Sequence, residues 1–251
     1  MNRLNLSGKI VLITGANGGI GSAIAKSIIE YNGIPILHYH KNNENVVALT
    51  AEYNKKGIKL YSCNFDIRNE KEVKEGIKSI IKEFGHLDSL VNNAGIVSRG
   101  FIPTLSLNTL NKVLDTNVIG NFSVLKNVAQ VMINQKYGNI VNISSLAGST
   151  GLKGQAAYSM SKASIDSMTR IAAKELAMYN VRVNAVAPGY VSAGMLENPS
   201  EQDIGYMRQI PMKRYAYDYE VADLVTFLLS DASSYITGQI LVIDGGLSIS
   251  L

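Results

Sequence analysis

The sequence is poor in the residues that build disulfides and metal sites. Its 251 residues include one cysteine, Cys63, and three histidines, His38, His40 and His86. A single cysteine excludes an internal disulfide, which fits a reducing compartment. The histidines lack the spacing of metal ligands and have no cysteine nearby. We therefore expect no bound metal.

Long apolar runs and a strong excess of one charge are also missing. No apolar stretch approaches the roughly 20 residues that span a membrane, and residues 1–5 lack the apolar core of a signal peptide. The net charge of +4, from 24 basic and 20 acidic residues, is too small to favour a nucleic-acid-binding protein. We expect a soluble, cytoplasmic protein that binds neither membranes nor nucleic acid.

Short apolar runs alternate with segments of helical periodicity, such as 22–31 and 70–84. The runs are rich in Val and Ile and bounded by Gly, Asn or Pro, as buried parallel strands are. They cover residues 9–13, 34–39, 59–65, 89–92, 138–143, 182–187 and 239–243. The alternation predicts βαβ units and one α/β domain over residues 1–251, a Rossmann-type doubly wound parallel sheet.

A glycine-rich turn follows the first predicted strand and opens onto a helix. It reads Thr14-Gly15-Ala16-Asn17-Gly18-Gly19-Ile20-Gly21. Glycines let the backbone approach a ligand closely, and a helix N-terminus offers free N–H groups to phosphates. The turn therefore indicates a dinucleotide site, although alone it also fits an ordinary tight turn.

Tyr158 and Lys162 stand four residues apart and would share one face of a helix. A cation beside a phenol favours the phenolate and so lowers the pKa of the phenol. Such a phenol can donate a proton near neutral pH. Alone the pair also fits a solvated helix face, but together with a hydride carrier it describes a carbonyl reductase.

Six motifs in one order extend this interpretation over nearly the whole chain. They are the turn from Thr14 to Gly21, Asn92-Asn93-Ala94-Gly95, Asn117, Ser145, Tyr158 to Lys162, and Pro188-Gly189. In these motifs the sequence resembles the short-chain dehydrogenase/reductases. Segments 210–214, 220–222, 235–239 and 244–246 make it most similar to the 3-oxoacyl-(acyl-carrier-protein) reductases.

The resemblance implies four catalytic residues. Tyr158 would be the general acid, and Lys162 would assist it and bind the nicotinamide ribose. Ser145 would hydrogen-bond the substrate oxygen, with Ser144 as a rival and a helix cap as its structural alternative. Asn117 would hold a water that relays protons to the lysine.

The resemblance also implies a set of cofactor contacts. Asp66 would meet the adenine amino group, its alternative being a place in the N-cap region of the next helix. Val191 would offer a backbone contact to the carboxamide. The whole set is Thr14, Gly15, Asn17, Gly18, Gly19, Ile20, Gly21, Tyr39, His40, Lys41, Asp66, Asn93, Gly95, Tyr158, Lys162, Pro188, Gly189 and Val191.

The end of the second strand favours NADPH over NADH. Enzymes that choose NAD place a carboxylate there, but none appears here before Glu44. Tyr39 stands in that place, and His40 and Lys41 could meet a 2′-phosphate. Gly18 replaces the arginine with which many relatives clamp that phosphate, so the preference would be smaller.

A second departure lies after Pro188-Gly189. Ala193 stands where many relatives carry a threonine that binds the nicotinamide amide, so backbone groups or Ser192 would take over that role. The irregular segment 192–209 would be a lid over the substrate.

We predict an NADPH-dependent ketone reductase whose substrate is a 3-oxoacyl chain on an acyl carrier protein. The alternatives are a dehydrogenase of a free small alcohol, sugar alcohol or steroid, and a catalytically silent dinucleotide sensor. An acidic carrier could dock on Lys136, Arg170 and Lys174, which could equally be a solvated face.

A homotetramer is expected from the resemblance, because relatives pack through the helix after Tyr158 and the region 239–247. Apolar residues supply the surplus in both segments: Ile165, Met168, Ile171, Ile240, Val242 and Leu247. A core helix in a monomer would look the same.

Overall fold

The structure, a computed structural model, describes residues 3–192 and 201–249. All seven apolar runs form strands of one parallel sheet, in the order β3-β2-β1-β4-β5-β6-β9. This confirms the predicted Rossmann-type sheet. The strands are β1 (Ile10–Ile13), β2 (Ile34–Tyr39), β3 (Tyr61–Asn64), β4 (Ser89–Asn92), β5 (Gly138–Ile143), β6 (Val181–Pro188) and β9 (Ile240–Ile243).

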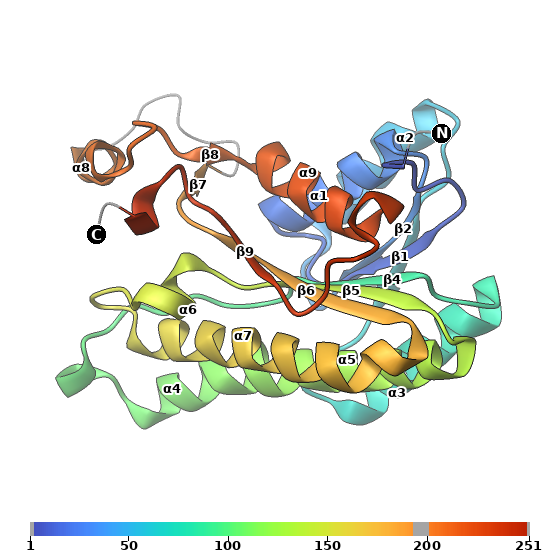
Figure 1. The fold of residues 1–251 in the computed structure, drawn as a ribbon, viewed down its shortest axis with the longest axis horizontal. Helices are drawn as coiled ribbons and strands as arrows, with labels where there is room; N and C mark the ends of the chain where they lie inside the picture. Colours follow the sequence, from blue (N-terminus) through green and yellow to red (C-terminus); the bar gives the residue numbers. More distant parts are fainter. Residues whose placement is uncertain (1–2, 193–200, 250–251) are drawn as a thin grey trace.

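Helices cover both faces of the sheet (Figure 1). One face carries α1 (Gly19–Glu30), α2 (Glu44–Lys55) and α9 (Asp218–Leu229). The other carries α3 (Glu70–Phe84), α4 (Leu107–Leu114), α5 (Asn121–Gln135) and α7 (Ala156–Leu176). Shorter helical segments are α6 (Leu146–Thr150), α8 (Glu201–Gln209), η1 (Ile102–Thr104), η3 (Ala177–Tyr179), η4 (Asp231–Ser233) and η5 (Leu247–Ile249).

Strand β1 explains why both faces are covered. Its side chains alternate, so Val11 and Ile13 enter the core beneath α1 and α9, while Ile10 and Leu12 enter the core beneath α3, α5 and α7. All four are buried. A strand that is apolar on both sides is stable only between two layers of helices, which gives the doubly wound architecture.

The neighbours of β1 fix where a ligand would bind. β1 pairs with β2 on one side and β4 on the other, so the strand order reverses there. In open parallel sheets, ligands sit outside the carboxyl ends of the strands at such a point. A small second sheet, β7 (Val191–Ser192) with β8 (Ala216–Tyr217), follows β6 at this edge.

Part of the predicted lid cannot be compared with the structure. Residues 193–200, including Ala193, lie outside the described residues. Within the described ranges, no helix combines the length and apolar character needed to cross a membrane.

Candidate active site

The glycine turn is packed so closely that only glycine fits. Gly15 has φ +65°, and a Cβ on it would lie 2.9 Å from the Ala94 Cα. A Cβ on Gly21 would lie 2.5 Å from the Gly15 carbonyl oxygen. Helix α1 starts at Gly19, and its N-cap, Gly18, makes no side-chain capping bond. This cradle of backbone N–H groups fits the pyrophosphate of a dinucleotide.

Thr14, which follows β1, and Asn93, which follows β4, join that turn to the end of β4. Thr14 Oγ1 accepts hydrogen bonds from the Asn93 and Ala94 amides at 2.9 and 3.0 Å. Asn93 Nδ2 donates to the carbonyls of Thr14 and Gly15 at 2.9 and 3.1 Å. Both residues were predicted as cofactor contacts, and their side chains fix the turn that would hold the cofactor.

Asn17 and His38 hold the turn from two other sides. Asn17 Oδ1 accepts from the Asn45 amide at 2.9 Å, at the start of α2. The Gly15 amide donates to His38 Nδ1 at 3.3 Å, and His38 Nε2 lies 2.9 Å from the Phe65 carbonyl oxygen. Because Nδ1 accepts, Nε2 carries the proton. His38 was not predicted, although a histidine in an apolar strand was the available signal.

Asn117 ties the loop after β4 to α7. It lies in a π-helical segment, Asp115–Gly120, and is fully buried. Its Oδ1 accepts from the Ile96 amide at 2.8 Å, and its Nδ2 donates to the Ile96 carbonyl at 2.9 Å and to Ser161 Oγ at 3.0 Å. Ser161 Oγ in turn donates to the Tyr158 carbonyl at 2.7 Å. Asn117 is thus one hydrogen-bonded step from the turn of α7 that carries Tyr158.

The two serines after β5 have different partners. Ser144 is buried and donates to Asp166 Oδ1 at 2.5 Å. Ser145 hydrogen-bonds the Tyr158 side chain and also caps α6 by accepting from the Ala147 amide at 3.2 Å. Ser145 therefore faces the predicted proton donor and Ser144 does not.

Lys162 and Tyr158 lie together on α7, with the ammonium 5.6 Å from the phenol ring centroid. Lys162 Nζ donates to the Ile143 carbonyl at 2.7 Å. Burial lowers the pKa of Lys162 to about 8, partly opposed by Asp166. Burial raises the pKa of Tyr158, and the hydrogen bond from Ser145 only partly opposes it. The expected lowering of the Tyr158 pKa is therefore wrong for the protein alone, because desolvation of the phenolate dominates.

A cavity of about 210 Å³ brings the predicted residues to one place. It lies at the carboxyl ends of β4, β5 and β6. The predicted residues that line it are Ile20, Asn93, Gly95, Ser145, Tyr158, Lys162, Pro188, Gly189 and Val191, and the rival Ser144 lines it as well.

Tyr39, His40 and Lys41 lie apart from this cavity, at the end of β2. His40 Nε2 is 3.7 Å from Asp66 Oδ2. Arg68, which was not predicted, binds both carboxylate oxygens of Asp66, with the closest contact 2.6 Å. The guanidinium holds the pKa of Asp66 at about 2.

Asp66 lies in the turn that leads into α3, as its structural alternative had it. Asn69 is the N-cap of α3, and its side chain accepts from the Lys71 and Glu72 amides. The Asp66 amide donates to Glu72 Oε2 at 2.8 Å, and the Asp66 carbonyl accepts from the Asn69 amide at 2.9 Å. The Asp66 carboxylate accepts from the Arg68 amide at 3.0 Å and lies beside His40 at the end of β2.

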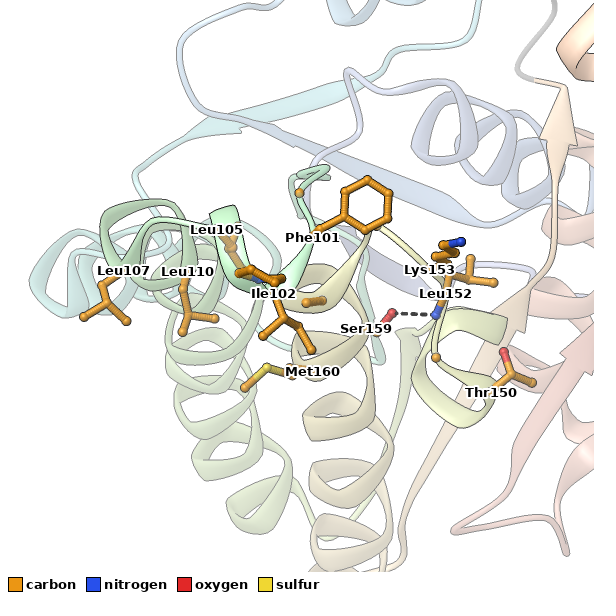
Figure 2. A pocket seen from close by; sticks show the side chains of 15 residues that line it. Phe101, Ile102, Leu105, Leu107, Leu110, Thr150, Leu152, Lys153, Ser159 and Met160 are labelled. Carbon is orange, nitrogen blue, oxygen red and sulfur yellow. Dashed lines mark hydrogen bonds between the residues drawn. The ribbon is translucent and has the colours of Figure 1, made fainter.

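An apolar pocket of about 790 Å³ lies near the start of α7 (Figure 2). Residues of η1, α4, α7 and the loop after α6 line it, among them Ile102, Leu105, Leu110, Leu152 and Met160. The Leu152 amide donates to Ser159 Oγ at 3.1 Å and joins that loop to α7.

An adjoining cleft of about 400 Å³ is lined by Arg99, Gln155, Tyr190 and Tyr206, and shares Gly100, Phe101, Lys153 and Gly154 with the apolar pocket.

The basic residues predicted to dock an acyl carrier lie far from the active site of the same chain. Arg170 and Lys174 lie 12 and 16 residues beyond Tyr158 on α7, about 18 and 24 Å along the helix. Lys136 follows α5 and precedes the amino end of β5. The motif order could not reveal that these side chains sit at the end of the sheet opposite the site.

The apolar surplus on α7 and near β9 is smaller than expected. Ile165 is buried, Met168 packs on the core beneath α3 and α5, and Leu247 is buried against Leu146 and Ile210. Ile171 and Val242 remain exposed, at 54% and 44%.

Comparison with known proteins decides the family. The family model described as enoyl-(acyl carrier protein) reductase matches residues 15–248. A 3-oxoacyl-(acyl-carrier-protein) reductase from Staphylococcus epidermidis is 37% identical over 240 residues, which are 95% of this chain and 98% of the relative. The chain belongs to the short-chain dehydrogenase/reductase family.

Two solved structures of the family agree with this fold. An NAD⁺-bound xylitol dehydrogenase is 36% identical, with a TM-score of 0.89 over 96% of this chain and 99% of its own. A gluconate 5-dehydrogenase from Burkholderia cenocepacia, in complex with NADP and tartrate, is 28% identical, with a TM-score of 0.93 over 100% and 99%. The protein is thus an NAD(P)H-dependent oxidoreductase that acts on alcohol and carbonyl groups.

Proposed function

We propose that the protein reduces the ketone of a 3-oxoacyl chain on an acyl carrier protein, with NADPH as reductant. The observation that carries this proposal is the Ser145–Tyr158–Lys162 arrangement at the mouth of a glycine cradle. The curated relatives at 37% and 38% identity, which act on 3-oxoacyl carriers by name, support the substrate class.

The residues divide the reaction among them. NADPH, when bound, supplies a hydride to the carbonyl carbon. Ser145 donates a hydrogen bond to the substrate oxygen as negative charge develops there. Tyr158 gives its proton to that oxygen, and the Lys162 ammonium compensates the charge left on the phenolate. Asn117 fixes the helix turn that carries Tyr158 and would hold the relay water.

The preference for NADPH has its support at the end of β2. His40 and Lys41 are exposed there, and Arg68 adds a guanidinium through its contact with Asp66. His40 and Arg68 flank the Asp66 carboxylate, and Lys41 is exposed at the same strand end, so basic side chains there could meet a 2′-phosphate. Arg68 offers a substitute for the arginine that Gly18 replaces.

A dehydrogenase of a free polyol or sugar acid is the second candidate. The resemblance to xylitol and gluconate dehydrogenases and the polar cleft with Arg99 and Lys153 favour it. A silent sensor is disfavoured, because it has no need of a proton donor beside a nicotinamide.

Oxidation of the reduced cofactor, followed by its absorbance, tests these candidates. We expect turnover with 3-oxoacyl thioesters, including the carrier-bound form, and none with enoyl thioesters, in which C3 carries no ketone oxygen to accept the Tyr158 proton. Faster oxidation of xylitol or gluconate than reduction of any 3-oxoacyl thioester would transfer the proposal to the second candidate.

We also infer that the enzyme assembles as a homotetramer and closes the segment 192–209 over its substrate. Exposed apolar side chains on the outer helices support assembly, including Ile119, Phe122, Met160 and Ile171. Light scattering at micromolar concentration should report four times the chain mass of 27.2 kDa, and a monomer mass would contradict assembly. Protection of the segment from proteolysis by cofactor with product would support closure, and equal cleavage would oppose it.

A further inference from the structure

The cleft lined by Arg99, Lys153, Gln155, Tyr190 and Tyr206 adjoins the cavity that holds Tyr158. Tyr190 lines the cleft, while its chain neighbours Gly189 and Val191 line the cavity. Gln155 is the N-cap of α7, three residues before Tyr158. A substrate whose carbonyl lies at Tyr158 would therefore extend into this cleft.

The loops that carry Arg99 and Lys153 are fixed to each other. The Gly100 amide donates to the Gly154 carbonyl at 2.8 Å, and Gly100 forms a β-bridge with Gln155. This pairing sets the starting points of the two cationic side chains side by side. The backbone therefore holds Arg99 and Lys153 on the same side of the cleft.

The opposite wall is a stack of tyrosines. Tyr190 lies between Tyr206 and Tyr215, with ring centroids 5.0 and 5.3 Å apart and interplanar angles of 22°. Arg99 is close enough for its charge to act against the burial that raises the pKa of Tyr190. The cation thus faces the aromatic wall across the cleft.

Among the described residues, the charge in the cleft is of one sign. None of the described residues that line it is an aspartate or glutamate, and neither Arg99 nor Lys153 forms an ion pair within those ranges. Other surface cations here, such as Lys126 and Arg214, do pair with carboxylates. An arginine fork and a lysine ammonium, held together beside hydroxyl groups, suit an oxyacid group.

We propose that Arg99 and Lys153 form a subsite for an anionic group of the substrate, a carboxylate or a phosphate. The proposal rests on the proposed function for the position of the reacting carbonyl. The shared chemistry has two sources: the phosphate of a phosphopantetheine arm, or the carboxylate of a small oxo acid.

Two pairs of ketones that differ in one anionic group separate these sources. The first is acetoacetyl-phosphopantetheine against acetoacetyl-pantetheine, and the second is acetoacetate against its methyl ester. We expect kcat/KM to favour the anionic member of one pair at least tenfold, and 0.5 M salt to reduce that preference. The pair that shows the preference identifies the source.

The double variant Arg99→Ala/Lys153→Ala should remove the preference and leave kcat/KM for the neutral member within about twofold. Arg99→Lys should keep part of it, since charge remains without the bidentate fork. Lys78→Ala, an exposed lysine on α3, is the matched control and should change nothing. Equal rates within both pairs, or an equal loss for both members in the double variant, would overturn the subsite.

A binding measurement keeps this test independent of turnover. Titration calorimetry with tartrate in the presence of NADP⁺ should give binding that the double variant weakens at least tenfold. Dimethyl tartrate, which lacks the carboxylates, should bind the wild type and the double variant with the same weak affinity. If no ketone is reduced but tartrate binding depends on both cations, the proposed function fails and the subsite stands. If ketones are reduced but tartrate binds the wild type and the double variant alike, the subsite fails alone.

Discussion

Lys162 and Ile143 are joined by a 2.7 Å hydrogen bond from the lysine Nζ to the carbonyl at the end of β5. The bond holds the ammonium at the strand end, 5.6 Å from the ring centroid of Tyr158. Burial of this side chain is the reason that the pKa of Lys162 falls from 10.5 to about 8. The ammonium charge that assists Tyr158 is therefore lost as pH rises through about 8.

The first prediction is a pH limit set by Lys162. Since the folded pKa lies below the unfolded value, the folded lysine loses its charge as pH rises through about 8. The free energy of unfolding should rise between about pH 8 and 10.5, because only the unfolded state still binds the proton. In contrast, kcat/KM for ketone reduction should fall above pH 8. In Lys162→Arg the residual activity should lose this alkaline limb, and an unchanged limb would assign it to another group.

Removal of the Tyr158 hydroxyl should slow the chemical step without weakening cofactor binding. Tyr158→Phe should lower kcat about 10²–10⁴-fold, the usual contribution of general acid catalysis, and leave the Kd of the cofactor near that of the wild type. Lys162→Ala should lower kcat and also weaken cofactor binding. Stopped-flow turnover with cofactor titration measures the two effects. Retention of more than about a tenth of the activity in Tyr158→Phe would remove it as the acid.

The adjacent serines should give opposite results. Ser145→Ala should lower kcat about 10²–10³-fold, as loss of an oxyanion donor does. Ser144→Ala should keep most turnover but lower the free energy of unfolding by about 1–3 kcal/mol, because the buried Asp166 loses its 2.5 Å hydrogen bond. Urea unfolding and steady-state rates check this, and a catalytic loss larger in Ser144→Ala would reverse the assignment.

The sheet could be predicted from the sequence because β1, β4, β5 and β6 are apolar and buried on both sides, although β3 and β9 are only partly buried. A short run of consecutive apolar residues can be recognised from local sequence alone, and each of the seven runs forms a strand. The ends differed by a residue or two where a polar neighbour extends the run, as at Lys9 before Ile10. The helix Glu70–Phe84 was predicted to the residue, because Asn69 caps its start and Gly85, in the left-handed region, ends it.

The site was less predictable where partners are distant in sequence. Thr14, Asn17 and Asn93 were assigned to the cofactor, but their side chains bond to one another's loops and to α2. The direction of the Tyr158 pKa shift depends on burial, which spacing along a helix does not contain. For the same reason the basic residues near the site were predicted as Lys136, Arg170 and Lys174, whereas Arg99 and Lys153, on two loops, line the cleft beside it.

His38 should make stability depend on acid. Burial lowers its pKa from 6.5 to about 4. The hydrogen bond to the Phe65 carbonyl opposes this shift, and the charges of His40 and Asp66 lower and raise the pKa by smaller amounts. Since the unfolded state takes up the proton first, the free energy of unfolding should fall from pH 6.5 to 4, by up to about 3 kcal/mol. His38→Asn should flatten this slope, and His86→Gln, an exposed control, should not. Urea midpoints across that range measure it, and equal slopes in all three proteins would contradict the prediction.

The choice between NADPH and NADH should depend on Lys41. It is exposed beside His40 at the end of β2, and the strand end itself carries no carboxylate before Glu44. A lysine meets a phosphate as a point charge, so its loss should cost NADPH alone. We expect Lys41→Ala to lower kcat/KM for NADPH about tenfold and to leave NADH within about twofold. Lys55→Ala, at the far end of α2, is the control. Rates with both cofactors and one ketone decide the matter: an equal loss for NADPH and NADH would mean that Lys41 does not contact the 2′-phosphate.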